Sequence, residues 1–407
     1  MRHKIAGALL LGALQALVAA NDAPTLAATI FVAGYDGFVR TVQLSTEGSS
    51  SKLTLVNQTD GCKTNPSWLT VDIENHRLWC LDEGFVAGFG TLNQFDIEDN
   101  GILTPVQHRN VSASPVHSKL YNGGKNIALA QFGNADATGI RGGLTIHSIN
   151  EKGTLGEMVN HTFDALPAPG PRAGQAVPRG HGVYPDPKDK NLVVLDYGAD
   201  VIRTFNLIPD GTGSLNIGSV LALPKGTGPR HAAFFSHTPT SQLYLFVISE
   251  FLNTISTFTV NYDANDAIVL AGPTHVIDTF GGKADAATLI NAKAAEIRVS
   301  YDSKFLIASN RNDTSFPESD SLATFRVKDD GSLDFVQLAA AGGLFPRAFQ
   351  VNLKGDRVLV AAQTDSKITV LDRNPQTGII GNVLAELAIN TTVDGVAAGL
   401  PAAIWNE

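Results

Sequence analysis

Short apolar segments alternate with polar turns along most of the chain, and the same order of segments recurs six times. Each copy opens with a proline or a small residue. It then runs through an apolar strand, a polar turn, a second apolar strand and a polar residue where that strand stops. The copies open at Asn65, Ser114, Arg179, Gly228, Ala294 and Phe345. Their spacing, roughly fifty to sixty-five residues, and their several short strands are typical of a β-propeller, in which equivalent positions surround one channel.

Each copy contains enough alternating segments for four strands. In the third copy, Asn191–Leu195 and Val201–Phe205 are rich in β-branched and aromatic residues, and a turn signal follows at Asp210–Gly213. Such runs between turn signals are read as strands. We therefore predict blades of four antiparallel strands.

The two chain ends predict a seventh blade. The segments Thr29–Ala33, Val39–Gln43 and Leu53–Val56 form a copy without its opening strand, and Leu400–Trp405 is an opening strand without its copy. Joining them removes two exposed sheet edges, which would otherwise invite association. We therefore expect an all-β fold, a monomeric seven-bladed β-propeller spanning residues 21–407 as one domain. The N- and C-terminal strands share the blade that closes it.

Two segments interrupt the repeat. Ala165–Pro178 is rich in proline, alanine and glycine and is expected to form a loop on one face of the propeller. Gly281–Lys293 is rich in alanine, which predicts a short helix.

The first twenty residues have the pattern of a secretory signal peptide. Arg2, His3 and Lys4 form a positive start, Ile5–Val18 is apolar, and small residues follow at positions 19 and 20. We expect residues 1–20 to be removed and the protein to be secreted. The alternative is a retained signal anchor.

The charge balance excludes some classes of partner. The chain carries 30 basic and 39 acidic residues; without Arg2 and Lys4 the balance is 28 − 39 = −11. An acidic surface of this kind argues against binding to nucleic acid or, after signal removal, to an anionic membrane. The chain also has no G-x-S-x-G elbow, phosphate-binding loop, dinucleotide fingerprint or H-E-x-x-H zinc motif. We therefore expect acid/base chemistry without a metal or another cofactor.

Other features agree with export. Five N-x-S/T acceptor triplets begin at Asn57, Asn110, Asn160, Asn312 and Asn390. Cys62 and Cys80 are the only cysteines, and they can pair in an oxidising compartment. The alternative is two buried free thiols, because Cys80 lies in an apolar strand.

Titratable and polar residues gather where the repeat brings the inner ends of the blades together. The second strands of the copies are predicted to end at Glu83, Gln131, Asp196, Glu250, Asn310–Arg311 and Gln363. Arginine forks suit carboxylates or phosphates, and a histidine beside a glutamate can move protons near neutral pH. The candidate channel residues are His117, His181, Arg230, His231, Glu250, Glu296, Arg311, Arg347 and Gln363. They predict a pocket for a small anionic substrate.

Structural roles for the same residues stay open at this point. His181 stands between two glycines and suits a turn, while Glu250 and Arg311 end apolar strands and suit ion pairs between blades. Glu296 and Arg347 can pair with each other. Asp196, in contrast, has the context of an aspartate that caps a turn.

Several motifs resemble those of one family. They are Gly228-Pro229-Arg230-His231, Ser249–Thr254, Ala308–Arg311, Phe345-Pro346-Arg347 and Ala361-Ala362-Gln363. In content and order they resemble the seven-bladed propeller lactonase family, also called the cycloisomerase 2 family. Its members include bacterial 6-phosphogluconolactonases and fungal 3-carboxy-cis,cis-muconate lactonizing enzymes.

The resemblance implies a catalytic set of His181, Arg230, Glu250 and Arg311. His117, His231, Glu296, Arg347 and Gln363 are then expected to bind substrate. The resemblance implies a lactonase or cycloisomerase that opens or forms a lactone ring on a small carboxylate, and the signal-peptide pattern adds that it is secreted. Arg230 and Arg311 clamp carboxylates, while His181 and Glu250 act as general acid and base. The alternatives are a ring-forming cyclase of secondary metabolism with an uncharged substrate, and a secreted binding or antigenic propeller without catalysis.

Overall fold

A computed structural model describes residues 25–85, 87–134, 139–313 and 315–407. The predicted signal peptide, residues 1–20, lies outside the described residues. No helix among the residues so described is long and apolar enough to span a membrane.

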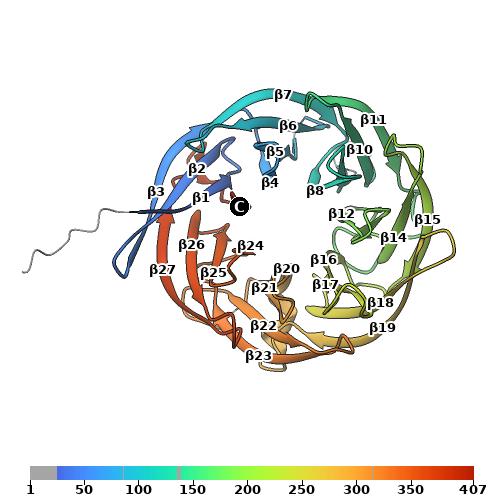
Figure 1. The fold of residues 1–407 in the computed structure, drawn as a ribbon. Helices are drawn as coiled ribbons and strands as arrows, with labels where there is room; N and C mark the ends of the chain where they lie inside the picture. The colour runs from blue at the N-terminus through green and yellow to red at the C-terminus, as the bar shows by residue number, and fades with distance from the viewer. Residues whose placement is uncertain (1–24, 86, 135–138, 314) are drawn as a thin grey trace, which may run out of the picture.

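The chain forms seven four-stranded antiparallel sheets arranged around a central channel, as predicted (Figure 1). The first complete blade comprises β4 (Pro66–Asp72), β5 (Arg77–Asp82), β6 (Gly90–Ile97) and β7 (Leu103–Val111). The second comprises β8 (Pro115–Tyr121), β9 (Asn126–Gln131), β10 (Gly143–Ile149) and β11 (Leu155–Thr162). The third comprises β12 (Gly180–Pro185), β13 (Asn191–Asp196), β14 (Val201–Leu207) and β15 (Leu215–Ala222).

The remaining three complete blades repeat this order. The fourth comprises β16 (Pro229–Phe235), β17 (Leu243–Ser249), β18 (Thr254–Tyr262) and β19 (Ile268–Asp278). The fifth comprises β20 (Lys293–Val299), β21 (Phe305–Arg311), β22 (Ser321–Val327) and β23 (Leu333–Ala340). The sixth comprises β24 (Pro346–Val351), β25 (Arg357–Ala362), β26 (Lys367–Arg373) and β27 (Ile380–Ala388).

The two ends of the chain build the seventh blade together. Its strand order is β3 (Ser50–Thr59), β2 (Val39–Glu47), β1 (Thr25–Ala33) and β30 (Ala402–Trp405). Ala33 pairs with Ala402 and Ile30 pairs with Trp405, so β30 supplies the innermost strand. The predicted closure by a shared blade is confirmed.

Short elements occupy the connections. α2 (Ala286–Asn291) lies in the alanine-rich insertion, as expected, and the Asp285 side chain caps it by accepting from Thr288 N–H. The predicted loop between β11 and β12 is irregular. A small hairpin of β28 (Thr392–Val393) and β29 (Val396–Ala397) precedes β30.

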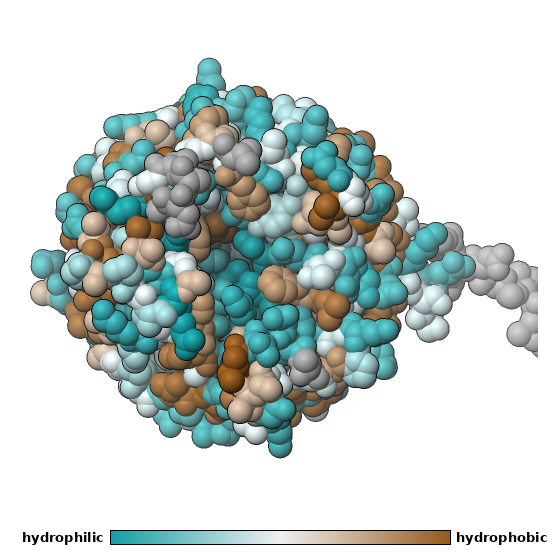
Figure 2. All heavy atoms as spheres, turned by 180° about the vertical axis from the view of Figure 1, so that it is seen from behind, coloured by the Kyte–Doolittle hydropathy of each residue, from teal (hydrophilic) through white to brown (hydrophobic). Residues whose placement is uncertain are grey.

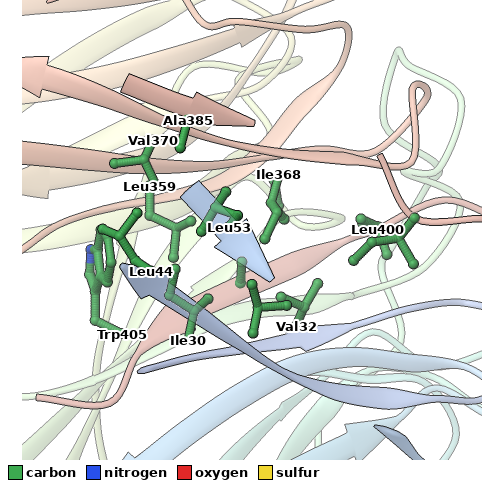
Figure 3. Close-up of a cluster of buried hydrophobic side chains, with 14 residues drawn as sticks. Ile30, Val32, Leu44, Leu53, Leu359, Ile368, Val370, Ala385, Leu400 and Trp405 are labelled. Atoms are coloured by element: carbon green, nitrogen blue, oxygen red, sulfur yellow. The ribbon is translucent and has the colours of Figure 1, made fainter. Parts of the chain in front are cut away.

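Apolar side chains fill the space between neighbouring blades. We call the boundary between the composite blade and the sixth blade the closing seam. There the composite blade packs its Ile30, Leu44 and Trp405 side chains against Leu359 and Val370 of the sixth blade (Figure 3). These side chains are at most 3% exposed, and fully burying one such aliphatic side chain stabilises a fold by about 1.5–3 kcal/mol. The seam is therefore part of the hydrophobic core.

The two cysteines form a disulfide. Cys62 and Cys80 are bonded with Cα atoms 6.0 Å apart, which ties the segment before β4 to β5. The alternative of two free thiols is thereby excluded. The glycosylation acceptors Asn110, Asn160, Asn312 and Asn390 are exposed and Asn57 is half-buried, so glycan attachment at these positions stays a prediction.

Candidate active site

A β-bulge near the start of the inner strands positions the candidate site. In β16, Pro229 pairs with Ser249 and His231 pairs with Ile248, so Arg230 is an extra residue without a partner. The equivalent extra residues of β4, β8, β12 and β24 are Ser67, Val116, His181 and Arg347. A bulge places two residues opposite one and re-aims their side chains. In these five inner strands the bulge therefore turns two successive side chains toward the channel.

Four of these five extra residues line a pocket at one mouth of the channel. Its volume is about 170 Å³, and Val116, His181, Arg230 and Arg347 contribute to its wall from the bulges. The rest of the wall follows or ends the second strand of five blades and comprises Glu83, Phe132, Tyr197, Glu250 and Arg311. On one face of the propeller, Figure 2 shows a hydrophilic hollow near the centre of the disc.

Glu250 connects two arginines in this pocket. Its Oε2 atom lies 3.0 Å from Arg230 Nε and 2.7 Å from Arg311 Nη2. Tyr197 donates a hydrogen bond to Oε1 at 3.2 Å. Burial favours the neutral carboxyl, but the guanidinium groups outweigh it and lower the pKa of Glu250 to about 2. Glu250 is therefore an ionised anchor at neutral pH.

The backbone of the fifth blade fixes both arginines further. Arg230 Nη1 donates to Ala295 O at 2.8 Å, and Arg311 Nε donates to Lys293 O at 3.1 Å. Burial and the neighbouring Arg311 lower the pKa of Arg230 to about 9. The two guanidinium groups are held close together in spite of their like charges because Glu250 lies between them.

A second carboxylate group lies on the other side of the pocket. Glu83 Oε1 accepts from the Tyr35 hydroxyl at 2.7 Å and from Arg347 Nη2 at 3.3 Å. Burial raises the pKa of Glu83, and Arg347 opposes this shift. The predicted pair of Glu296 with Arg347 does not form, because Arg347 pairs with Glu83.

His181 is the residue of the pocket that is suited to proton transfer. Its ring is 6% exposed and lies 5.9 Å from the Phe132 ring and 6.0 Å from the Tyr197 ring, between centroids. Nδ1 is buried and has no hydrogen-bond partner among the described residues. Burial, followed by the nearby Arg230 charge, holds the pKa of His181 well below its usual value. The imidazole is therefore neutral at pH 7, and its ring forms part of the pocket wall.

The predicted residues His117 and His231 lie one position deeper than the extra residues. Their ring centroids are 5.0 Å apart, and the His117 ring also lies 4.4 Å from Trp68 and 4.9 Å from Tyr184. We call the cluster of Trp68, His117, Tyr184 and His231 the aromatic plug, because it fills the channel below the pocket. His117 and His231 therefore do not line the pocket in which substrate binding was predicted.

Glu296 and Gln363 also lie outside the pocket wall. Glu296 Oε2 lies 3.0 Å from His231 Nδ1, and Oε1 lies 3.2 Å from Arg298 Nε, beyond the plug. Gln363 follows β25, and its backbone N–H donates to Phe345 O. The structure thus brings together His181, Arg230, Glu250, Arg311 and Arg347 in the pocket wall. The other four predicted residues lie outside that wall, although the His231 ring lies 5.0 Å from the His181 ring, between centroids.

The sequence analysis did not identify Phe132 and Tyr197 as pocket residues. The predicted strand ends Gln131 and Asp196 do end β9 and β13, but the aromatic residues that follow them line the pocket. Asp196 caps the turn instead, as its context indicated, by accepting from Arg179 N–H at 2.8 Å and Ala199 N–H at 3.0 Å. Glu83 was predicted as a strand end but not as a pocket residue. It directly follows β5 as Glu250 directly follows β17, and this equivalence is the signal in the sequence that could have placed it in the pocket.

Within the described ranges, no three histidine, cysteine, aspartate or glutamate side chains form a group that could hold a metal ion.

Comparison with known proteins identifies the family. Residues 28–396 match the model of the family described as "Lactonase, 7-bladed beta-propeller". The chain belongs to this lactonase family. The match covers most of the propeller, including every residue of the pocket wall.

Individual relatives share less than a third of their residues with this chain. A "Probable 6-phosphogluconolactonase" of Arthroderma benhamiae is 25% identical over 349 residues, covering 86% of this chain and 83% of the relative. An uncharacterized protein of Staphylococcus saprophyticus is 28% identical over 316 residues, covering 76% of this chain and 82% of the relative. The Pseudomonas aeruginosa periplasmic gluconolactonase PpgL has a TM-score of 0.74 at 21% identity, covering 93% of this lactonase-family chain and 98% of PpgL. That structural likeness supports the fold.

Proposed function

We propose that this protein hydrolyses a small lactone in the pocket of His181, Arg230, Glu250, Arg311 and Arg347. The observation that carries the proposal is a neutral His181 in the wall of a pocket whose arginines are fixed by carboxylates. A proton acceptor and fixed cations are the two requirements for adding water to an ester carbonyl. Membership of the lactonase family supports the same class of reaction.

The proposed reaction begins with proton transfer from a water molecule to His181. The hydroxide adds to the lactone carbonyl carbon, and the carbonyl π electrons move to the oxygen. The guanidinium groups of the pocket stabilise this oxyanion. When the carbonyl re-forms, the ring C–O bond breaks and the leaving alkoxide takes the proton from the imidazolium. One lactone and one water give one hydroxy acid, and His181 returns to its neutral form.

Glu250 has a positioning role in this proposal. Its pKa of about 2 and its contacts with Arg230 and Arg311 keep it ionised, so it has no proton to donate at neutral pH. The general acid and general base are therefore the same residue, His181, at successive steps. This revises the expectation in which His181 and Glu250 shared those roles.

The ion pairs of the pocket arginines limit the charge that a substrate can carry. Arg230 and Arg311 are paired with Glu250, and Arg347 is paired with Glu83. A phosphate dianion or a tricarboxylate needs several cations that are free to turn toward it. The cavity of about 170 Å³ also lies below the roughly 300 Å³ at which drug-sized pockets begin. We therefore propose an uncharged or singly charged single-ring lactone and rank hydrolysis above cyclisation of carboxymuconate.

Export of the protein is part of the proposal. The Cys62–Cys80 disulfide supports an oxidising compartment, and the exposed acceptor asparagines are accessible to glycosylation. Mass spectrometry of the protein from a culture medium tests the mature N-terminus and the glycans together.

The activity is tested by following ring opening by NMR with glucono-1,5-lactone, its 6-phosphate and 3-carboxymuconate. We expect turnover of the unphosphorylated lactone. In the His181→Gln variant, kcat should fall at least about a hundredfold. The exposed His237 gives the matched control, and His237→Gln should keep full activity with the same thermal unfolding as His181→Gln. Full activity of His181→Gln, or a panel in which no lactone is opened, contradicts the proposal.

A further inference from the structure

The opposite mouth of the channel contains a second cavity, separate from the pocket described above. Its volume is about 240 Å³, and its wall includes Lys119 of β8, Glu296 and Arg298 of β20, and Gln350 of β24. These residues lie toward the far ends of the inner strands. Lys119 is three residues beyond Val116, or about 10 Å along an extended strand. The aromatic plug lies between the two cavities.

The charges of the opposite mouth are unbalanced. Lys119 is half-buried and forms no ion pair with any residue that the structure describes. Burial, followed by repulsion from Arg298, lowers the pKa of Lys119 to about 8. Two cations from different blades therefore face one cavity.

The carboxylate in the cavity wall is already engaged. Glu296 Oε2 contacts His231 Nδ1, and Oε1 contacts Arg298 Nε and accepts from the Ile297 N–H at 3.2 Å. Burial raises the pKa of Glu296, but the adjacent His231 and Arg298 outweigh it and lower it to about 2. One ionised carboxylate thus faces two cations, which leaves one positive charge without compensation.

Donors suited to an anion remain available around this cavity. Arg298 uses Nε toward Glu296, and its two terminal nitrogens bond to no residue in the described part of the chain. The side-chain oxygen of Gln350 accepts from Trp405 N–H at 3.1 Å, which leaves the amide nitrogen as a donor. A guanidinium fork beside an ammonium group is the arrangement that binds carboxylate and phosphate oxygens.

We propose that the opposite mouth of the channel is a binding site for a small free oxyanion, held by Lys119, the terminal nitrogens of Arg298 and the Gln350 amide. The ligand carries a carboxylate or a phosphate group. It does not pass to the lactone pocket, because the aromatic plug separates the two. The site is independent of the proposed hydrolysis, so one proposal can fail without the other.

Isothermal titration with inorganic phosphate, and separately with acetate, tests this site. We expect saturable binding of one or both to the wild-type protein. Lys119→Met keeps the aliphatic stem and should weaken binding at least tenfold, the effect of losing one charge-assisted contact. The matched control is Arg347→Met at the lactone pocket, which should bind as the wild type does. No saturable binding, unchanged binding by Lys119→Met, or loss in Arg347→Met alone overturns the proposal.

A measurement on the wild-type protein removes any dependence on the folding of a variant. A neutral amine reacts with acetic anhydride, so the acetylation of Lys119 can be followed by peptide mass spectrometry. The bound anion should slow acetylation of Lys119 at least several-fold and leave the exposed Lys125 unaffected. Equal rates at Lys119 with and without the saturating anion contradict the proposed site.

Discussion

Arg311 reaches across a blade boundary to Glu250, and its Nη2 atom lies 2.7 Å from the Glu250 Oε2 atom. Arg311 ends β21 of the fifth blade, whereas Glu250 follows β17 of the fourth. Both side chains are at most 10% exposed. The contact therefore joins two blades at the pocket and shapes the site at the same time.

Replacing Glu250 tests this double role. In Glu250→Gln, Arg230 and Arg311 stay buried without a counter-charge, and breaking a buried pair costs about 3–5 kcal/mol. We expect urea unfolding to show a loss of that size. Turnover of Glu250→Ala should fall at least about a hundredfold, because the arginines lose their positions. The control is Glu386→Gln, which breaks an ion pair with Lys367 in which Glu386 is 56% exposed and should cost under about 1 kcal/mol. Equal losses in the two glutamine variants would show that the pocket pair has no structural role.

The rate of hydrolysis should persist into mild acid. His181 must be neutral to accept a proton, and burial with the Arg230 charge keeps its pKa well below the ordinary 6.5. A pH profile of kcat/KM should therefore keep its plateau below pH 6 and decline only in stronger acid. An acidic limb centred at or above pH 6.5 would contradict the assigned base.

Folding stability should fall as the pH is lowered from 6.5 to 5. Burial lowers the pKa of His117, His147, His181 and His231, so in this range the unfolded chain binds protons that the folded chain does not. Each such histidine contributes a slope of about 1.4 kcal/mol per pH unit. Glu83, whose pKa is raised, acts in the opposite sense wherever its folded form binds more protons than its unfolded form.

Urea unfolding at several pH values measures the net slope. His147 lies in β10, outside both cavities, and its pKa of about 4 follows first from burial. Substituting His147→Phe removes one such histidine. It should therefore reduce the slope of stability against pH by about 1.4 kcal/mol per pH unit and leave the pH profile of turnover unchanged. Stability that is constant or rises on acidification would refute the neutral state of these histidines.

The fold was predictable from the chain because its signals are local. Alternating apolar positions, turn residues and repeat spacing are properties of short segments, and the incomplete copies at the two ends required a shared blade. The pocket residues His181, Arg230, Glu250, Arg311 and Arg347 also followed from the repeat and the family motifs. What the sequence did not reveal was the register of each inner strand.

The bulges explain why some predicted residues lie outside the pocket wall. In a regular strand, neighbouring side chains point to opposite faces, so His117 and Val116 cannot both face the channel. The extra residue in β8 turns both toward it, with Val116 at the mouth and His117 in the plug. The register of a strand depends on the strand with which it pairs. In β8, Pro115 pairs with Gln131 of β9 and His117 pairs with Ala130, and no residue pattern in the sequence marks this pairing.

Removal of the last strand should open the propeller. Without residues 400–407, β1 loses its partner β30 and the seam loses the buried Leu400 and Trp405. The exposed edge of β1 then pairs with other chains. We expect size-exclusion chromatography of this truncated chain to show oligomers or aggregates, and the full chain to elute as a monomer. A monomeric truncated chain of unchanged thermal stability would show that closure is dispensable.

The bulges leave one position of the pocket wall open to redesign. Val116 is an extra residue of β8, so its exchange leaves the pairs of Pro115 and His117 with β9 in place. It also carries no charge and takes no part in the ion pairs of Glu83 or Glu250. We therefore expect exchanges of Val116 to change the substrate selectivity of the proposed hydrolysis, while the strand pairs of the blade and the ion pairs of the pocket remain as they are.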